Sequence, residues 1–154
     1  MGLDQYLHAR RFSFPSKNLE AYDKEFDEIK QLLGEDKKFL DKSLPSASIE
    51  ITVGYWRKAN AIHRWFVDNC QQGVDDCRSA GVEREQLKEL KKLCAEVIKN
   101  PNKAGELLPT TEGFFFGSTD YDEWYTQELK STIAIINNCL RMGERWQFTY
   151  SSSW

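Results

Sequence analysis

Long apolar stretches are missing from this sequence. No run approaches the ~18 consecutive apolar residues by which a membrane-spanning helix is recognised. The first residues lack the apolar core of a signal peptide, and Met1-Gly2 is not followed by the Ser or Thr that N-myristoylation requires. We therefore expect a cytoplasmic protein that is neither embedded in a membrane nor anchored to one.

Metal-binding spacings are missing too. The sequence has two histidines and four cysteines, and Cys70, Cys77, Cys94 and Cys139 show neither CxxC spacing nor a nearby histidine pair. A zinc site is not expected, and no cofactor is predicted. The thiols should stay free in a reducing compartment. Cys94 and Cys139 fall within helical patterns and are predicted to be core residues.

A basic surface is also missing. The formal net charge is −3, and neither half of the chain is a basic tail, which argues against general nucleic-acid binding. Nothing repeats with a period of roughly 20–50 residues, and no linker divides the chain. The 154 residues therefore predict a single globular domain over 1–154.

Aromatic side chains, by contrast, are abundant. They make up 13% of the sequence, with five Trp, six Tyr and nine Phe. Because each buries a large area, the simplest interpretation is a well-packed small core. The alternative is that some of them form a stacking surface for a planar ligand, which requires them to be exposed.

Two clear patterns lie near the N-terminus. Residues 3–12 alternate as in a β-strand, and one side of that strand carries Leu3, Gln5, Leu7 and Ala9. Apolar residues from Leu19 to Leu33 then recur at helical spacing. Ser16 or Asn18 is the expected N-cap of this helix, and Gly34 its end.

The segment from Ile49 to Asn69 is ambiguous, because its first half fits a strand and most of it also fits a helix. We favour a helix from about Val53 to Asn69 with Thr52 as its N-cap. Residues 35–48 are predicted to form a short helix or a loop.

Further elements follow toward the C-terminus. The patterns predict a helix over 82–99, a loop over 104–111, a short buried strand over 114–116, a helix over 120–140 and a closing strand over 145–154. Together the elements predict an α+β fold, in which a small mixed or antiparallel sheet of about three to four strands packs against about four helices.

Several segments also carry a family resemblance. They are GLDQYL (2–7), GYWRKANAIHRWF (54–66), DNCQQGVDDC (68–77), LPTTEGFFFGSTDYDEWY (108–125) and WQFTYSSSW (146–154). In these the sequence resembles a family of small, functionally unassigned proteins encoded by tailed bacteriophages and prophages. The resemblance implies a phage accessory protein in the cytoplasm of the infected bacterial host, with a host-takeover or counter-defence role. The family has no settled activity, so no catalytic residue is carried over.

The first candidate site is Gly117, Ser118 and Thr119 before the predicted helix. A helix N-terminus can hold an anion through its free N–H groups. The acids that follow favour a structural interpretation, because Asp120 and Glu123 have capping-box spacing. A hard-metal site at Asp120, Asp122 and Glu123 is an alternative whose spacing matches no familiar metal-binding loop.

The second candidate is the segment 55–65, which places donors beside tryptophans. Trp56, Arg57, Asn60 and His63 are the residues predicted to contact a planar or anionic ligand. Equally consistent with the pattern is that Asn60 and His63 are buried polar groups tying a helix to the sheet, because polar groups on an apolar stripe must find partners.

The third candidate is the histidine pair. A site built on His8 and His63 is the only histidine-based acid/base site that the sequence allows. A structural role is the alternative for each. The serines at 151–153 have no paired base, and no GxSxG elbow is present.

These observations favour a non-enzymatic protein that binds, and so blocks or sequesters, a host protein or a small anionic, nucleotide-like ligand. The alternative is a small enzyme of nucleotide or phosphoester metabolism that uses His8, His63 and Asp120, with or without a divalent metal ion. The oligomeric state is left open, a homo-oligomer included.

Overall fold

The computed structural model describes residues 2–15, 20–43 and 45–154. Its internal contacts divide the chain into two compact units, one formed by residues 1–9 with 52–154 and the other by residues 10–51. Within the described ranges, no helix is long and apolar enough to cross a membrane. The single domain over 1–154 stays a prediction.

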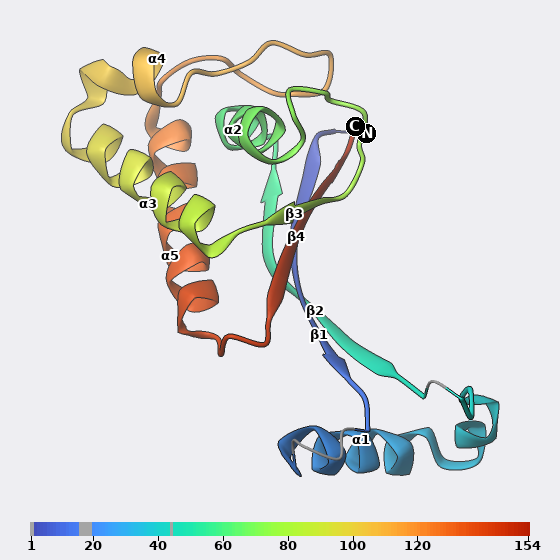
Figure 1. The fold of residues 1–154 in the computed structure, drawn as a ribbon. Helices are drawn as coiled ribbons and strands as arrows, with labels where there is room; N and C mark the ends of the chain where they lie inside the picture. The colour runs from blue at the N-terminus through green and yellow to red at the C-terminus, as the bar shows by residue number, and fades with distance from the viewer. Residues whose placement is uncertain (1, 16–19, 44) are drawn as a thin grey trace. The chain divides into compact units, whose positions relative to one another are not determined.

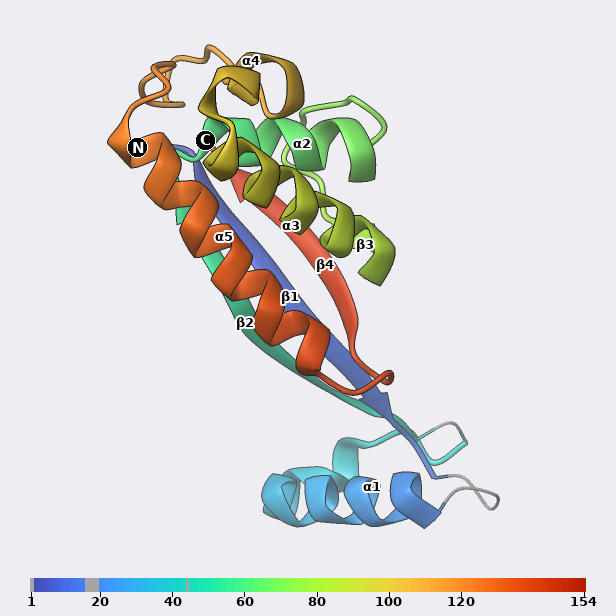
Figure 2. The same ribbon diagram turned by 90° about the vertical axis from the view of Figure 1, so that its left-hand side faces the viewer.

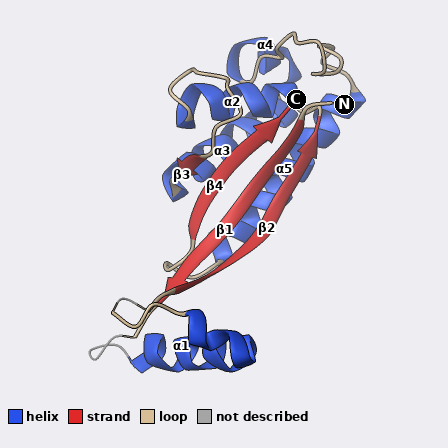
Figure 3. Cartoon of the chain, turned by 90° about the vertical axis from the view of Figure 1, so that its right-hand side faces the viewer, coloured by secondary structure: helices blue, strands red, loops and turns tan. Residues whose placement is uncertain are grey.

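The strands form one antiparallel sheet (Figure 3). They are β1 (Asp4–Ser13), β2 (Ala47–Arg57), β3 (Ala80–Val82) and β4 (Gln147–Ser153), in the spatial order β2-β1-β4-β3. β3 pairs with β4 so that Gly81 lies opposite Thr149. Residues 4–9 of β1 and 52–57 of β2 belong to the first unit, and the other residues of both strands belong to the second. The predicted α+β fold is confirmed, with a sheet of the antiparallel kind.

Helices of the first unit cover one face of this sheet (Figures 1 and 2). They are α2 (Asn60–Cys70), α3 (Arg84–Lys99) and α5 (Glu123–Arg141), while the short α4 (Ala104–Leu107) follows a 3₁₀ turn at Pro101–Lys103. α3 packs against α5. The predicted helices over 82–99 and 120–140 are thus confirmed, each starting two or three residues later than expected.

The core lies between these helices and the sheet. The side of β1 that was predicted to share one face is fully buried, at Leu3, Gln5, Leu7 and Ala9. At the centre, the Phe66 ring of α2 stacks on the Tyr150 ring of β4 with 4.1 Å between their centroids. All four cysteines are free thiols, and Cys94 and Cys139 are core residues as predicted.

The predicted helix over 53–69 is wrong in its first third, where the chain is strand β2 and Thr52 caps nothing. The sequence here fits both the helical and the strand period, and hydrogen-bonded pairing with β1 stabilises the strand. Gly54 shows how closely this strand meets the helical layer, since a Cβ there would lie 2.8 Å from Cγ2 of Ile135. A glycine is what lets α5 approach the sheet at this point.

Two predictions near residue 120 are also wrong. Residues 114–116 form a turn and no strand, since the Phe116 N–H donates to the Gly113 carbonyl and Phe114 is 94% exposed. The N-cap of α5 is Asp122, whose Oδ1 accepts the Tyr125 N–H at 2.9 Å, and not Asp120. Capping acts at the residue where the backbone enters the helix, and spacing alone misplaced that residue by two positions.

The second unit contains α1 (Glu20–Leu33) and a 3₁₀ helix (Gly34–Phe39). Phe26 is buried, and Gly34 takes a φ of +54° where α1 ends, as its sequence position predicted. The 3₁₀ helix agrees with the short helix or loop expected over 35–48, except that Ala47 and Ser48 already belong to β2. The expected N-caps Ser16 and Asn18 and the start of the stripe at Leu19 lie outside the described residues.

Candidate functional site

A cleft of about 260 Å³ opens in the first unit. Three segments line it: the corner between β2 and α2, the loop over 110–120, and the first turns of α5. These include parts of both segments that the sequence singled out, at 55–65 and at 117–123. The cleft therefore unites two of the three candidate regions.

The floor of the cleft depends on two unusual backbone positions. Lys58 has a φ of +62°, and Gly117 has a φ of +88°. A Cβ on Gly117 would lie 3.1 Å from Cβ of Lys58, so the two corners are in close contact. The Lys58 N–H donates to the Leu3 carbonyl at 2.7 Å, which holds this left-handed residue in place. Strain of this kind persists only where surrounding contacts enforce it.

Asn60 ties the loop over 110–118 to α2. Its Nδ2 donates to the carbonyls of Phe116 and Ser118 at 3.1 and 2.8 Å. Its Oδ1 accepts the Thr111 N–H at 3.1 Å. Only 3% of the residue is exposed. Asn60 lines the cleft, but its amide is used to shape the cleft wall.

The lining of the cleft carries charges of both signs. Arg57 and Lys58 stand at the β2–α2 corner, both exposed, and neither forms an ion pair with a described residue. Asp120, Asp122 and Glu128 line the same cleft. A ligand in the cleft therefore meets both cations and carboxyl groups.

Trp124 and Glu128 lie one turn apart on α5, so they share a face of that helix. The Trp124 side chain is 78% exposed and offers an open ring. Glu128 is half-buried and has no hydrogen bond or ion pair from its carboxyl group to any described residue. Burial, and secondarily the negative charge of Asp122, raises the pKa of the Glu128 carboxyl to about 7.

This carboxyl group makes stability depend on pH. The pKa of Glu128 is about 7 in the folded state, against about 4.3 for an unfolded glutamate. Its contribution is therefore fully present below about pH 4 and is lost as the pH rises through 7. Glu128→Gln keeps the shape without titrating. Between about pH 5 and 8, we expect wild type to lose about 1–2 kcal/mol relative to this variant, after discounting for partial exposure.

Urea unfolding at both pH values measures this loss. Glu123→Gln is the matched control, because Glu123 is exposed on the same helix and does not line the cleft. A wild-type pH profile that Glu128→Gln leaves unchanged contradicts the assignment.

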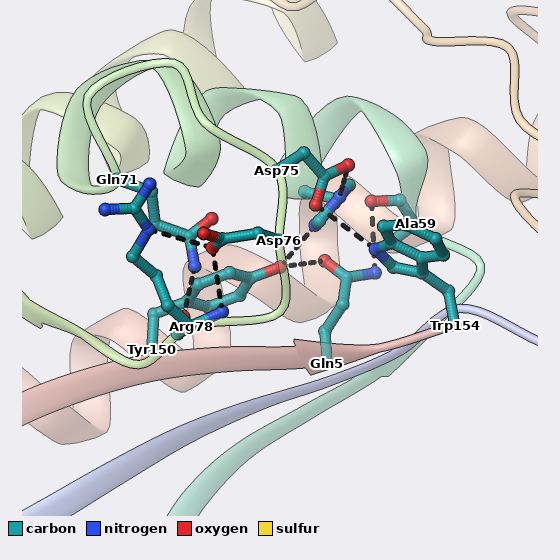
Figure 4. Close-up of polar contacts among 9 residues, drawn as sticks. Gln5, Ala59, Gln71, Asp75, Asp76, Arg78, Tyr150 and Trp154 are labelled. Atoms are coloured by element: carbon teal, nitrogen blue, oxygen red, sulfur yellow. Dashed lines mark hydrogen bonds and ion pairs between the residues drawn. The ribbon is translucent and has the colours of Figure 1, made fainter.

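His63, a predicted contact residue, is buried behind the cleft and does not line it. Its Nδ1 lies 2.8 Å from the Tyr150 hydroxyl and its Nε2 lies 2.9 Å from Oδ2 of Asp75. In Figure 4, Gln5 on β1 and Tyr150 on β4 meet each other, and Trp154, which directly follows β4, reaches toward Asp75. The Tyr150 hydroxyl donates to Gln5, and the Trp154 indole N–H donates to Asp75. The structural interpretation of His63 is the one that its contacts support.

The His8–His63 pair does not form. Gln5, which belongs to the His63 network, faces the core from β1. His8 belongs to the alternate set of β1 side chains, stacks with Tyr6 at 6.0 Å and lies 3.3 Å from Oγ1 of Thr52. Successive side chains of a strand point to opposite faces. The alternative catalytic set of His8, His63 and Asp120 is therefore corrected: its members do not converge.

The alternative metal site does not assemble either. The Asp120 carboxylate accepts the Ser118 hydroxyl at 2.9 Å, and Asp122 is used as the helix cap. In the described part of the chain, no group of three or more His, Cys, Asp or Glu side chains could hold a metal ion. Asp120, Asp122 and Glu123 remain separate carboxylates around a helix start.

Of the predicted ligand contacts, the cleft brings together Arg57, Asn60, Gly117 and Ser118. It leaves out three. Trp56 is buried and donates its indole N–H to Thr132 at 2.8 Å, Thr119 offers its carbonyl to Thr110, and His63 lies in the core. Sequence reasoning missed Lys58, Thr110, Trp124, Tyr125 and Glu128. The spacing of Trp124 and Glu128 was a usable signal, because it puts a ring beside an acid on one helical face.

Comparison with known proteins adds no assignment: no family model, no curated protein and no solved structure matches this chain.

Proposed function

We propose that this protein binds a small anionic, nucleotide-like ligand in the cleft between the β2–α2 corner and α5, and so sequesters it. The observation that carries the proposal is the cleft itself, with two cations and an open tryptophan ring among its lining residues. Of the two targets that the sequence suggests, a host protein or a small ligand, the concave site favours the small ligand.

The two cations of the cleft suit an anionic group. Arg57 and Lys58 have no acidic partner among the described residues, so a ligand phosphate or carboxylate competes with no internal ion pair. Arginine can grip such a group with two parallel N–H donors, and lysine adds a point charge. The exposed Trp124 ring gives a planar ligand a stacking surface.

The wider role rests on the sequence resemblance. A phage accessory protein in the cytoplasm of an infected bacterium would act by withdrawing such a ligand from a host process, in takeover or counter-defence. A binding protein needs no catalytic group, and the two histidines lie outside the cleft.

The test is calorimetric titration with a panel of mononucleotides. Arg57→Ala is expected to weaken binding at least about 10-fold, the loss of one charge-assisted contact. Arg64→Ala is the matched control, because Arg64 is exposed on α2 outside the cleft, where it pairs with Asp68 at 3.5 Å. Equal affinities for wild type and Arg57→Ala, or no binding of any nucleotide, would reject the proposed site.

One observation favours the enzyme alternative. The Glu128 carboxyl lines the cleft with a pKa of about 7, which suits a general acid or base at neutral pH. The same panel, incubated with Mg²⁺ or Mn²⁺ and analysed for products, decides the point. Turnover that Glu128→Gln abolishes would replace sequestration with catalysis.

A further inference from the structure

The carboxyl group of Glu128 lacks hydrogen-bond donors. It is half-buried on α5, receives no hydrogen bond from a described residue, and faces the cleft. Its oxygens are not among the fully buried atoms that lack a partner, so they stay open to the cleft. N–H groups of a ligand can therefore reach this carboxylate and donate to it.

Neighbouring charge limits which ligand groups can approach. Asp120 and Asp122 line the same cleft, and the charge of Asp122 acts on Glu128. A group that points a lone pair at these acids is repelled, whereas N–H donors are attracted. Two adjacent N–H groups match the two oxygens of one carboxylate.

The Trp124 ring beside Glu128 favours a planar shape for the ligand group that donates to Glu128. Trp124 lies one turn before Glu128 on the same face of α5. A planar group stacked on Trp124 presents its edge, and not its face, to the carboxylate. The anionic part of the ligand is then left for Arg57 and Lys58, which line the same cleft from the β2–α2 corner.

We propose that Glu128 selects the ligand of this cleft by accepting two adjacent N–H groups from the edge of a planar group stacked on Trp124. This inference rests on the function proposed above and deepens it. A guanine base carries such an edge, with its ring N–H beside its exocyclic amine. Adenine places a ring acceptor beside its amine and so offers Glu128 one donor and one lone pair. The guanidinium of arginine is a second source of the same chemistry.

The experiment compares GMP, AMP and L-arginine by calorimetry at about pH 8, where Glu128 is ionised. We expect GMP to bind at least about 10-fold more tightly than AMP, the usual discrimination from one bidentate contact. In Glu128→Gln the preference for GMP should be lost or reversed toward AMP, because an amide offers one acceptor and one donor group, which match the edge of adenine. Glu123→Gln, an exposed acid outside the cleft, should keep the wild-type ratio.

The pH dependence gives a second readout. GMP and AMP share the same phosphate, so its titration cancels in their affinity ratio. That ratio should rise with pH through about 7, as Glu128 ionises, and should be flat in Glu128→Gln.

The outcomes separate the two proposals. If GMP and AMP bind wild type equally well, or if Glu128→Gln keeps the preference, the inference is overturned while nucleotide binding stands. If L-arginine saturates the cleft and GMP does not bind, the proposal that Glu128 accepts two adjacent N–H groups is upheld. The proposal of a nucleotide-like ligand is then overturned. If none of the three binds, both are overturned.

Discussion

Replacing His63 with alanine is expected to lower the free energy of unfolding by about 3–5 kcal/mol. His63 is 1% exposed and contacts groups from three different segments. Its removal leaves the Tyr150 hydroxyl and the Asp75 carboxylate each without one partner. It also leaves a cavity beside Phe116, whose ring meets the imidazole edge-on at 5.1 Å.

The hydrogen bonds of this network hold the ring from both sides. Gln5 donates its amide to the Ala59 carbonyl, and its oxygen accepts the Tyr150 hydroxyl. Nδ1 of His63 lies against the Tyr150 oxygen, and Nε2 lies against the Asp75 carboxylate. Removal of the ring therefore leaves two polar groups each without one partner in a largely buried place.

Urea unfolding checks the prediction, and the chain supplies its own control. His8→Ala removes the only other histidine, from a partly exposed position with one polar contact of 3.3 Å to Thr52 and a ring contact with Tyr6, and should cost less than about 1 kcal/mol. Similar losses for the two variants would show that the His63 network contributes little to stability.

Asn60→Asp should have the largest effect on the cleft. The change keeps the shape of the side chain but replaces two N–H donors with a carboxylate oxygen. That oxygen would face the carbonyls of Phe116 and Ser118. We expect a loss of about 2–4 kcal/mol in unfolding free energy and at least a 10-fold loss of ligand affinity, because the loop over 110–118 loses its attachment to α2.

Hydrogen exchange locates the damage. Faster exchange in Asn60→Asp should be concentrated over 110–120, while α3 keeps its protection. Asn69→Asp on the same helix is the control, since Asn69 is exposed and its amide reaches only the Trp65 carbonyl at 2.8 Å. It should change stability by no more than about 1 kcal/mol. A wild-type affinity in Asn60→Asp would contradict the role given to this residue.

Some elements could be predicted from local pattern because local pattern and tertiary contacts agree there. The alternation in β1 matches a strand with one buried side, and the stripes of α3 and α5 match helices with one buried side. In each case the apolar period equals the period of the backbone. The prediction was wrong in the first third of 53–69, where both the helical and the strand period fit and pairing with β1 selects the strand. It was also wrong at 114–116, where the three phenylalanines form a turn and pair with no strand.

The residues of the candidate site were likewise predictable only where they carry a local sequence signal. Arg57 and Gly117 were found because a cation and a glycine turn carry a recognisable local signal. Glu128 was missed because a glutamate in a helix is ordinarily solvated, and nothing in its neighbours along the chain shows that it is half-buried. The corner at Lys58 was missed because its φ of +62° is imposed by contacts with Leu3 and Gly117, both distant in sequence.

By itself, then, the sequence determined the fold class, the buried side of β1, the helices α3 and α5 and the core positions of Cys94 and Cys139, because periodicity is a local property of the chain. Only the tertiary structure decided that His63 is a core residue and that Arg57, Trp124 and Glu128 line one cleft. Whether a side chain is buried, and which side chains line one cleft, depends on which distant segments of the chain come into contact. Those contacts are set by the packing of the whole first unit and not by any one stretch of residues.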